Sequence, residues 1–300
     1  MKKERFKSPD YNWIYNQYMK LIQIKKYKTG HGNMYQKAVE EFLLFMERNN
    51  VSELHFDRDQ LTAYYSYLIQ RPSRRKGTLS DNTVNHHLFA IKLLFELILD
   101  SGKADSVPML PKYLRGNYTQ REVLSVDEIK HLYSLTENKL EAALLSAAYG
   151  CGLRRSEIEA LNLLDVDLRA AILIVRSGKN SKRREVPLSN KVITDFRAYL
   201  TEERFENLKH HQEAFFINGH GNRMRGNSHY SNLKSIIGRS TAPGFEDKKI
   251  TLHSLRHSIA THLAEKGADI YFIKSFLGHT HIDTSHLYAI RRKRQTNLFH

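Results

Sequence analysis

The chain has 300 residues, 47 of them Lys or Arg and 32 Asp or Glu, so its formal net charge is +15 at pH 7. Apolar residues make up 41%, which excludes a disordered chain and suffices for one large domain or two modest ones. A single cysteine excludes an intramolecular disulfide and a multi-thiolate metal site, and the lack of any run of about 18 apolar residues excludes a membrane span. The charged start argues against a secretory signal, so we expect a cytoplasmic protein.

Helical periodicity dominates the first third of the chain. Apolar residues spaced three and four apart predict helices over Met34–Arg48 and Gln60–Ile69. The strongest pattern covers Asp81–Leu99, where Ser80 precedes the helix as a cap and Gly102 follows its end.

A stretch with few apolar residues separates this region from the rest of the chain. Residues 101–120 hold prolines and glycines in a pattern typical of a linker. A capping box at residues 125–128 then begins a new periodic stretch. We therefore predict a helical domain at 1–114, a linker at 115–122 and a second domain at 123–300.

The second domain is expected to be mostly helical around one small sheet. Ala171–Arg176 predicts a short strand, Glu185–Leu188 its partner, and 177–182 the turn between them. Helices are predicted at 127–135, 140–149, 156–162, 191–204, 227–238, 252–266 and 269–276. The fold class is thus mainly α with a small antiparallel β-sheet.

Four segments of the second domain carry side chains suited to phosphoryl transfer. They are an arginine three residues before an acid, a turn lysine, an H-x-x-R pair, and a late histidine followed by a tyrosine: Arg154, Glu157, Lys179, His253, Arg256, His279 and Tyr288. Taken singly, each has a plainer interpretation as a surface ion pair, a solvated lysine, or a packed histidine or tyrosine.

In combination, these side chains supply what phosphodiester transfer requires without a metal or another cofactor. Arginines bind the non-bridging oxygens of a phosphate and neutralise its growing charge. A tyrosine is a nucleophile that forms a covalent intermediate, and histidine and lysine exchange protons with the nucleophile and the leaving oxygen. The histidines lack a carboxylate or thiolate at ligand spacing, so no metal site is predicted.

The same segments, in their order, resemble the tyrosine recombinase family, also called phage-type integrases: GCGLRRSEI, SGKNSKRREVPL, HSLRHSIATHLAEKG and FLGHTHIDTSHLY. In the first domain, a weaker resemblance to the family's core-binding domain is carried by LSDNTVNHHLFAIKLLFELI. The resemblance implies a helical, SAM-like core-binding domain followed by a mixed α/β catalytic domain of tyrosine recombinase type. The architecture is similar to the simpler one of Xer recombinases, small transposon integrases and DNA invertases.

The resemblance also assigns roles. The catalytic set it implies, with Glu157 as a supporting acid, is Arg154, Lys179, His253, Arg256, His279 and Tyr288. Tyr288 would attack a scissile phosphate to form a 3′-phosphotyrosine, and Lys179 would protonate the leaving 5′ oxygen. The 5′ hydroxyl of a partner strand would then attack that linkage.

The implied partner is double-stranded DNA with an inverted-repeat core site. Four protomers would exchange strands through a Holliday junction, with or without accessory proteins, to integrate, excise, invert or resolve DNA. Two alternatives stay open: DNA relaxation by a type IB topoisomerase, and a non-catalytic DNA-binding regulator.

The positive charge agrees with a polyanionic partner, although solubility or a lipid surface would also explain it. Candidate DNA contacts are Arg74, Arg75, Lys76, Asn85, Lys182, Arg183 and Arg184. His86 and His87, beside Asn85, are expected to face a groove of the DNA. A solvated surface is the plain alternative for each basic run.

Overall fold

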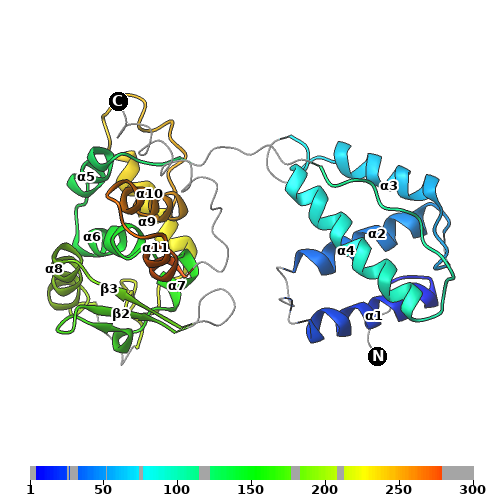
Figure 1. Cartoon of the computed structure of the whole chain (residues 1–300), viewed down its shortest axis with the longest axis horizontal. Coiled ribbons are helices and arrows are strands. Elements are labelled where there is room, and N and C mark those ends of the chain that lie inside the picture. Colours follow the sequence, from blue (N-terminus) through cyan, green and yellow to red (C-terminus); the bar gives the residue numbers. More distant parts are fainter. Residues whose placement is uncertain are drawn as a thin grey trace. The chain divides into compact units, whose positions relative to one another are not determined.

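The computed structural model describes residues 5–25, 27, 33–51, 53–73, 77–114, 122–176, 183–207 and 213–278. The chain divides into two compact units, Met1–Thr119 and Gln120–His300 (Figure 1). Each unit has a hydrophobic core of its own. Most of the linker expected at 115–122 lies outside the described residues. Within the described ranges, no helix is both long and apolar enough to cross a membrane.

The described part of the first unit is helical. Its helices are α1 (Pro9–Ile24), α2 (Met34–Arg48), α3 (Arg58–Gln70) and α4 (Asp81–Asp100). Each begins after a polar residue whose side chain accepts a hydrogen bond from a backbone N–H of the first turn, which satisfies a donor that the helix leaves unpaired: Ser8, Asn33, Asp57 and Ser80.

Aromatic side chains fill the core between these helices. The ring of Phe42 on α2 lies with its centroid 5.0 Å from that of Tyr64 on α3 and 5.9 Å from that of Phe95 on α4. α4 matches its predicted range within one residue, whereas α1 was not predicted. A serine cap followed by Pro9 at the first helical position was the available signal for α1.

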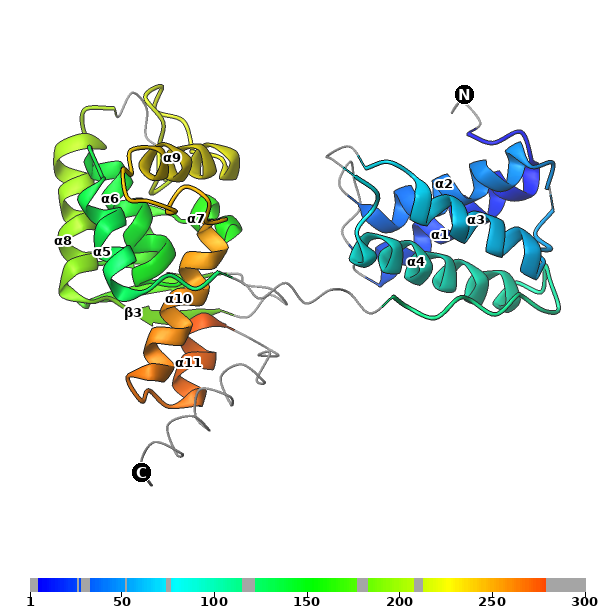
Figure 2. The same cartoon turned by 90° about the horizontal axis from the view of Figure 1, so that it is seen from above.

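The second unit contains a three-stranded antiparallel sheet. The strands β1 (Val166–Asp167), β2 (Ile172–Val175) and β3 (Arg184–Pro187) pair in that order, and Leu173 faces Val186. Figure 2 shows one of these strands, β3, with helices on either side. The prediction of a mainly helical fold with a small antiparallel sheet is therefore confirmed.

The remaining described elements of this unit are helical. They are α5 (Val126–Ser134), α6 (Lys139–Leu145), α7 (Arg155–Ala160), α8 (Asn190–Ala198), α9 (Gly226–Gly238), α10 (Leu252–Glu265) and α11 (Ile270–Leu277), with π-helical turns at Ser146–Gly150 and Tyr199–Glu203 and a 3₁₀ turn at Leu163–Asp165. The predicted helices at 140–149 and 191–204 thus each change from α to π geometry near their ends.

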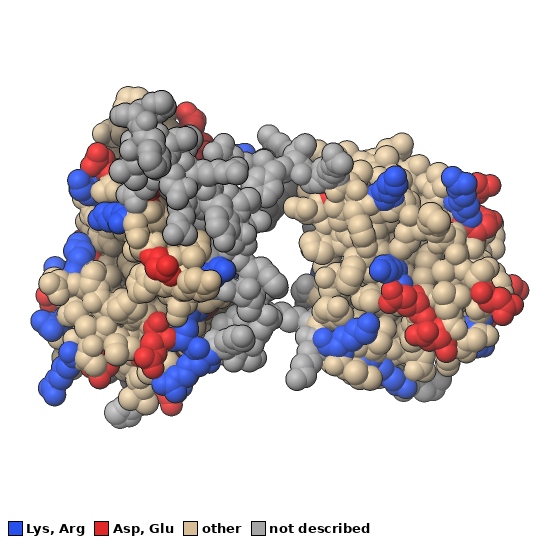
Figure 3. All heavy atoms as spheres, viewed as in Figure 1, with Lys and Arg blue, Asp and Glu red and all other residues tan. Residues whose placement is uncertain are grey.

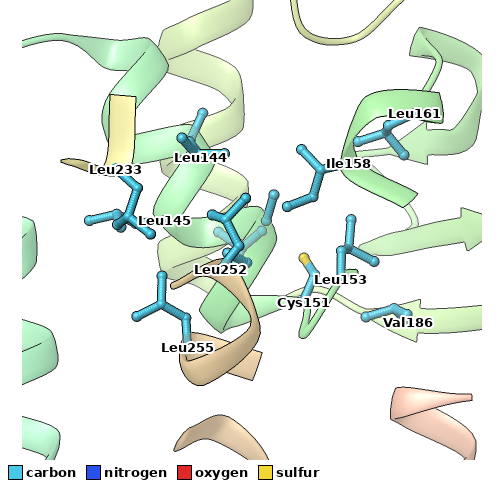
Figure 4. Packing of buried hydrophobic residues seen from close by; sticks show 14 of the residues in the cluster. Leu144, Leu145, Cys151, Leu153, Ile158, Leu161, Val186, Leu233, Leu252 and Leu255 are labelled. Carbon is cyan, nitrogen blue, oxygen red and sulfur yellow. The ribbon is translucent and has the colours of Figure 1, made fainter. Parts of the chain in front are cut away.

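Leucine-rich packing joins these elements. Figure 4 shows Leu145 of α6, Leu153 before α7, Val186 of β3 and Leu255 of α10 converging in one core. α11 packs against both β3 and α10. The core thereby brings the start of α7, the start of β3 and the end of α11 together, and these positions carry the charged residues considered next.

Candidate active site

A tight loop places Arg154 at the start of α7. The π-helical turn Ser146–Gly150 precedes it, and Gly152 then adopts a left-handed conformation with φ +58°. A Cβ at Gly152 would lie 2.8 Å from Cδ2 of Leu277, so only glycine lets this loop approach the end of α11 so closely. Arg154 is the N-cap residue of α7.

Glu157 is the acid at the centre of the site. Its side chain is only 3% exposed, and Oε1 accepts a 2.6 Å hydrogen bond from Nη1 of Arg154. Arg184 binds the same carboxylate through two nitrogens, with Nη1–Oε1 at 2.9 Å and Nη2–Oε2 at 2.7 Å. Nη1 of Arg256 lies 3.7 Å from Oε2. One buried carboxylate therefore binds or neighbours three guanidinium groups.

This arrangement keeps Glu157 ionised. Burial by itself would raise the pKa of the carboxyl, but hydrogen bonds and charge from Arg184, the backbone N–H of Arg154 and the charge of Arg256 lower the pKa to about 2. Burial and the positive charge of Arg154 lower the pKa of Arg256 to about 9, against the opposing effect of Glu157. The cluster keeps a positive excess that suits an anionic ligand.

The same three arginines bind the C-terminal end of α11. Nε of Arg184 donates to the carbonyl of Phe276 at 3.0 Å, and Nη2 of Arg256 donates to the carbonyl of Leu277. Nη2 of Arg154 donates to the carbonyl of Gly278 at 3.0 Å. Three successive carbonyls at a helix end, which lack partners within the helix, are thus each bound by a different guanidinium.

The H-x-x-R pair lies at the start of α10. Arg256 is buried, with 2% of its side chain exposed, and Nη1 donates to the carbonyl of Gly152. His253 is exposed on the same helix, with its Nε2 3.2 Å from Nε2 of His257. The structure therefore brings Arg154, Glu157 and Arg256 together. The predicted Lys179, His279 and Tyr288 lie outside the described residues.

Two of the predicted DNA contacts have side chains turned to the protein. Arg184 is 7% exposed, and its guanidinium donates to Glu157 and to the carbonyl of Phe276, so the exposed position expected for it is not found. The Asn85 amide exchanges two 2.8 Å hydrogen bonds with the backbone of Leu114. Arg183 is exposed, and the others lie outside the described residues: Arg74, Arg75, Lys76 and Lys182.

His87 also differs from its expected position facing a groove. It is 4% exposed in the helical core, and Nδ1 lies 3.2 Å from the hydroxyl oxygen of Tyr64. Burial, and the charges of Arg71 and His86, lower the pKa of His87 to about 4, so it is a neutral core residue at pH 7. His86, next to it, is exposed.

Sequence reasoning missed Arg184 as a member of the arginine cluster. The signal was the two-residue period of β3, in which Val186 points inward and the residue two before it shares that face. Grouping Arg184 with the basic run before it concealed this alternation.

The surface charge distribution does not distinguish a DNA-binding face in the view shown. Lys and Arg are interspersed with Asp and Glu over the described parts of both units in Figure 3. The face shown therefore has no continuous basic patch among its described residues, and candidate DNA contacts are identified residue by residue.

Similarity to known proteins extends over most of the chain. The model of the phage integrase family matches residues 122–294. Tyrosine recombinase XerC of Chlamydia pneumoniae is 30% identical, with 97% of this chain and 93% of the relative covered. Tyrosine recombinase XerD of Staphylococcus epidermidis (strain ATCC 35984) is also 30% identical, with 95% of this chain and 96% of the relative covered.

Solved structures share the fold. XerH recombinase, in a post-cleavage complex with its palindromic difH substrate, matches with a TM-score of 0.69 at 20% identity, covering 99% of this chain and 89% of that one. The Tn1549 transposon integrase with transposon right-end DNA matches with a TM-score of 0.69 at 16% identity, covering 96% and 99%. The matched family model and the full-length similarity to XerC show that the chain belongs to the phage integrase family of tyrosine recombinases.

Proposed function

We propose that this recombinase breaks and rejoins DNA at a specific site through a covalent 3′-phosphotyrosine at Tyr288. The observation that carries the proposal is the buried Glu157 carboxylate between Arg154 and Arg256, the two arginines that the family resemblance assigns to catalysis. Arginines preoriented by a shared acid are suited to bind the non-bridging oxygens of a phosphate and to stabilise the charge that develops there.

The proposed reaction needs no external energy source. The Tyr288 hydroxyl attacks the scissile phosphorus, forms a new P–O bond and loses its proton, while the bond to the 5′ oxygen breaks. Lys179 protonates that leaving oxygen, and His253 and His279 assist the proton transfers and bind the phosphate. The 5′ hydroxyl of a partner strand then attacks the phosphotyrosine, so the number of phosphodiester bonds is conserved.

The assembly we propose is a homotetramer on two duplexes, each with an inverted-repeat core site, that proceeds through a Holliday junction. It is supported by the complexes of XerH and the Tn1549 integrase, which contain DNA, and by the palindromic substrate of the former. Arg183, exposed beside β3, remains a proposed DNA contact, as do the basic residues outside the described ranges: Arg74, Arg75, Lys76 and Lys182. With DNA as substrate, we place the protein in the cytoplasm, on the nucleoid of a bacterial-type cell.

Covalent capture tests this function. Wild-type protein and Tyr288→Phe are incubated with sheared DNA from the host, and DNA fragments that stay bound to protein in SDS are recovered and sequenced. We expect adducts with the wild type alone, concentrated on one inverted-repeat motif, because only a tyrosine oxygen can form the phosphotyrosine. Non-covalent binding by Tyr288→Phe, measured before SDS is added, is the control for folding.

Other outcomes would favour the alternatives. Adducts scattered over the DNA without a motif would indicate relaxation of the type IB topoisomerase kind. Specific binding without adducts would favour a regulator, and adducts that persist in Tyr288→Phe would assign the nucleophile to another residue.

A further inference from the structure

Arg184 is the least exposed partner of Glu157 after Arg256, and among the residues that the structure describes its guanidinium alone binds the carboxylate through two side-chain nitrogens. Its side chain is 7% exposed, and the two bonds, at 2.9 and 2.7 Å, involve both carboxylate oxygens. A planar guanidinium bound in this way fixes the rotation of the carboxylate as well as its position. The orientation of Glu157 then determines where Arg154 is bound.

Arg184 also binds α11. All three of its guanidinium nitrogens donate to protein groups, because Nε is bonded to the carbonyl of Phe276 at 3.0 Å. The side chain passes Gly278 so closely that a Cβ there would lie 2.9 Å from Cδ and 2.9 Å from Nη1 of Arg184. The arginine is therefore enclosed between α7 and the end of α11, where it has no nitrogen left without a protein acceptor.

We propose that Arg184 is a positioning residue for strand cleavage, which acts by orienting Glu157 and by binding the end of α11. This inference rests on the proposed function, in which Arg154 and Arg256 contact the scissile phosphate. Through Glu157, Arg184 fixes the orientation of the two catalytic arginines. Through the carbonyl of Phe276, it fixes the position of the end of α11, after which the chain continues toward His279 and Tyr288.

The competing explanation is a stabilising ion pair with no bearing on chemistry. The two explanations differ in what a substitution changes. A stabilising pair alters the fraction of folded protein, whereas a positioning residue alters the rate of the chemical step in protein that is folded and bound to DNA.

The test separates binding from cleavage in Arg184→Lys and Arg184→Gln. Each variant is measured for affinity and for single-turnover covalent adduct formation at saturating protein, on the duplex recovered by covalent capture and well below the unfolding temperature. We expect affinity to change by less than about threefold and the cleavage rate to fall by about 100-fold, since lost orientation of a reacting group has that effect. Arg184→Lys keeps the charge and the length of the stem, so it is the variant expected to fold.

Arg204→Lys is the matched control. Arg204 is also buried, 5% exposed, and donates from Nε and Nη2 to the carbonyls of Phe215 and Ala214. Its substitution is expected to lower the unfolding temperature while the cleavage rate of the folded protein stays within about threefold of wild type, because a surface or structural change away from the site leaves the chemical step intact.

Hydrogen exchange provides a second readout that needs no DNA. In Arg184→Lys, amides near the end of α11, around Phe276 to Gly278, are expected to exchange at least about tenfold faster than in wild type and in Arg204→Lys, since the helix end loses a bound guanidinium. If wild-type protein captured no DNA, that result would count against the proposed function. Hydrogen exchange would then still test whether Arg184 positions the end of α11. Unchanged exchange, a wild-type cleavage rate, or a loss of affinity that accounts for the lost cleavage would each overturn the inference.

Discussion

Glu157 combines three tasks in one side chain. Its carboxylate accepts from the backbone N–H of Arg154 at 2.9 Å, which caps α7, and from the guanidinium groups of Arg154 and Arg184. Three guanidinium groups lie around this one carboxylate. The carboxylate compensates their positive charges, which could not be buried together without it. Local helix capping and the geometry of the candidate site therefore depend on the same residue.

We predict that Glu157→Gln destabilises the second unit and abolishes covalent capture. Removing the charge leaves Arg184 and Arg256 buried without a counter-charge, which costs about 3–5 kcal/mol for a buried pair. Urea unfolding of the full chain measures the loss, and the capture experiment measures activity. Glu185→Gln, an exposed carboxylate on β3, is the control, expected to change stability by less than about 0.5 kcal/mol. If Glu157→Gln were as stable as Glu185→Gln, Glu157 would not be the counter-charge that the buried arginines require.

At the scale of elements, α11 is the helix on which the site converges. It ends at Gly278, which adopts a left-handed conformation with φ +62°, and its last carbonyls are bound by arginines from outside the helix. α7, β3 and α10 each contribute one of those arginines. The end of α11 is thus bound to three other elements. We therefore expect a substitution at Gly278 to alter the hydrogen bonds between α11 and these elements.

We predict that Gly278→Ala impairs cleavage more than its backbone strain explains. The new Cβ would meet Cδ and Nη1 of Arg184 at 2.9 Å and displace that side chain from Glu157. Gly244→Ala is the matched control because Gly244 also has a positive φ, +73°, and nothing within 4 Å of the added Cβ. Both variants carry the cost of a left-handed alanine, about 1–2 kcal/mol.

Single-turnover adduct formation by folded protein distinguishes the two glycine variants. A fall of about tenfold or more in Gly278→Ala, with Gly244→Ala near wild type, is the expected result for a displaced supporting residue. Equal rates in the two variants would show that Arg184 adjusts without consequence.

At the scale of the whole molecule, each unit contains a buried neutral histidine in its own core. Burial, with the charges of Arg71 and His86, lowers the pKa of His87 in the first unit to about 4. Burial also lowers the pKa of His229 in the second unit to about 4, although Glu159 opposes the shift. Both imidazoles remain unprotonated in the folded chain at pH values where the unfolded chain protonates them.

We predict that both units lose stability as the pH falls from about 6.5 to about 4, since in that window the unfolded state binds protons that the folded state does not. Each histidine accounts for up to about 3 kcal/mol of this loss. Urea unfolding at a series of pH values measures it. His229→Leu is expected to have a shallower pH dependence of stability than wild type. If the unfolding free energy of His229→Leu depended on pH as steeply as that of wild type, the lowered pKa of His229 would not be the cause of the loss of stability.

Much of the secondary structure could be predicted because it is encoded locally. The stripe of apolar residues and the Ser80 cap in α4, and the alternation in β2 and β3, are visible within short windows. Arg184 and His87 are buried where exposed positions were expected, and the reason is the same for both. Both are polar residues inside basic or polar runs, and their burial depends on partners distant in the sequence, namely Glu157 and Tyr64.

Sequence alone was enough to assign the family, because the motifs GCGLRRSEI and HSLRHSIATHLAEKG resemble those of tyrosine recombinases. Tertiary structure alone decided which groups share the Glu157 carboxylate and which bind the end of α11. The physical reason is that a charge enters the interior only where a partner compensates its desolvation. Whether a partner such as Phe276, distant in sequence from Arg184, lies within hydrogen-bond distance is set by the packing of β3 against α11.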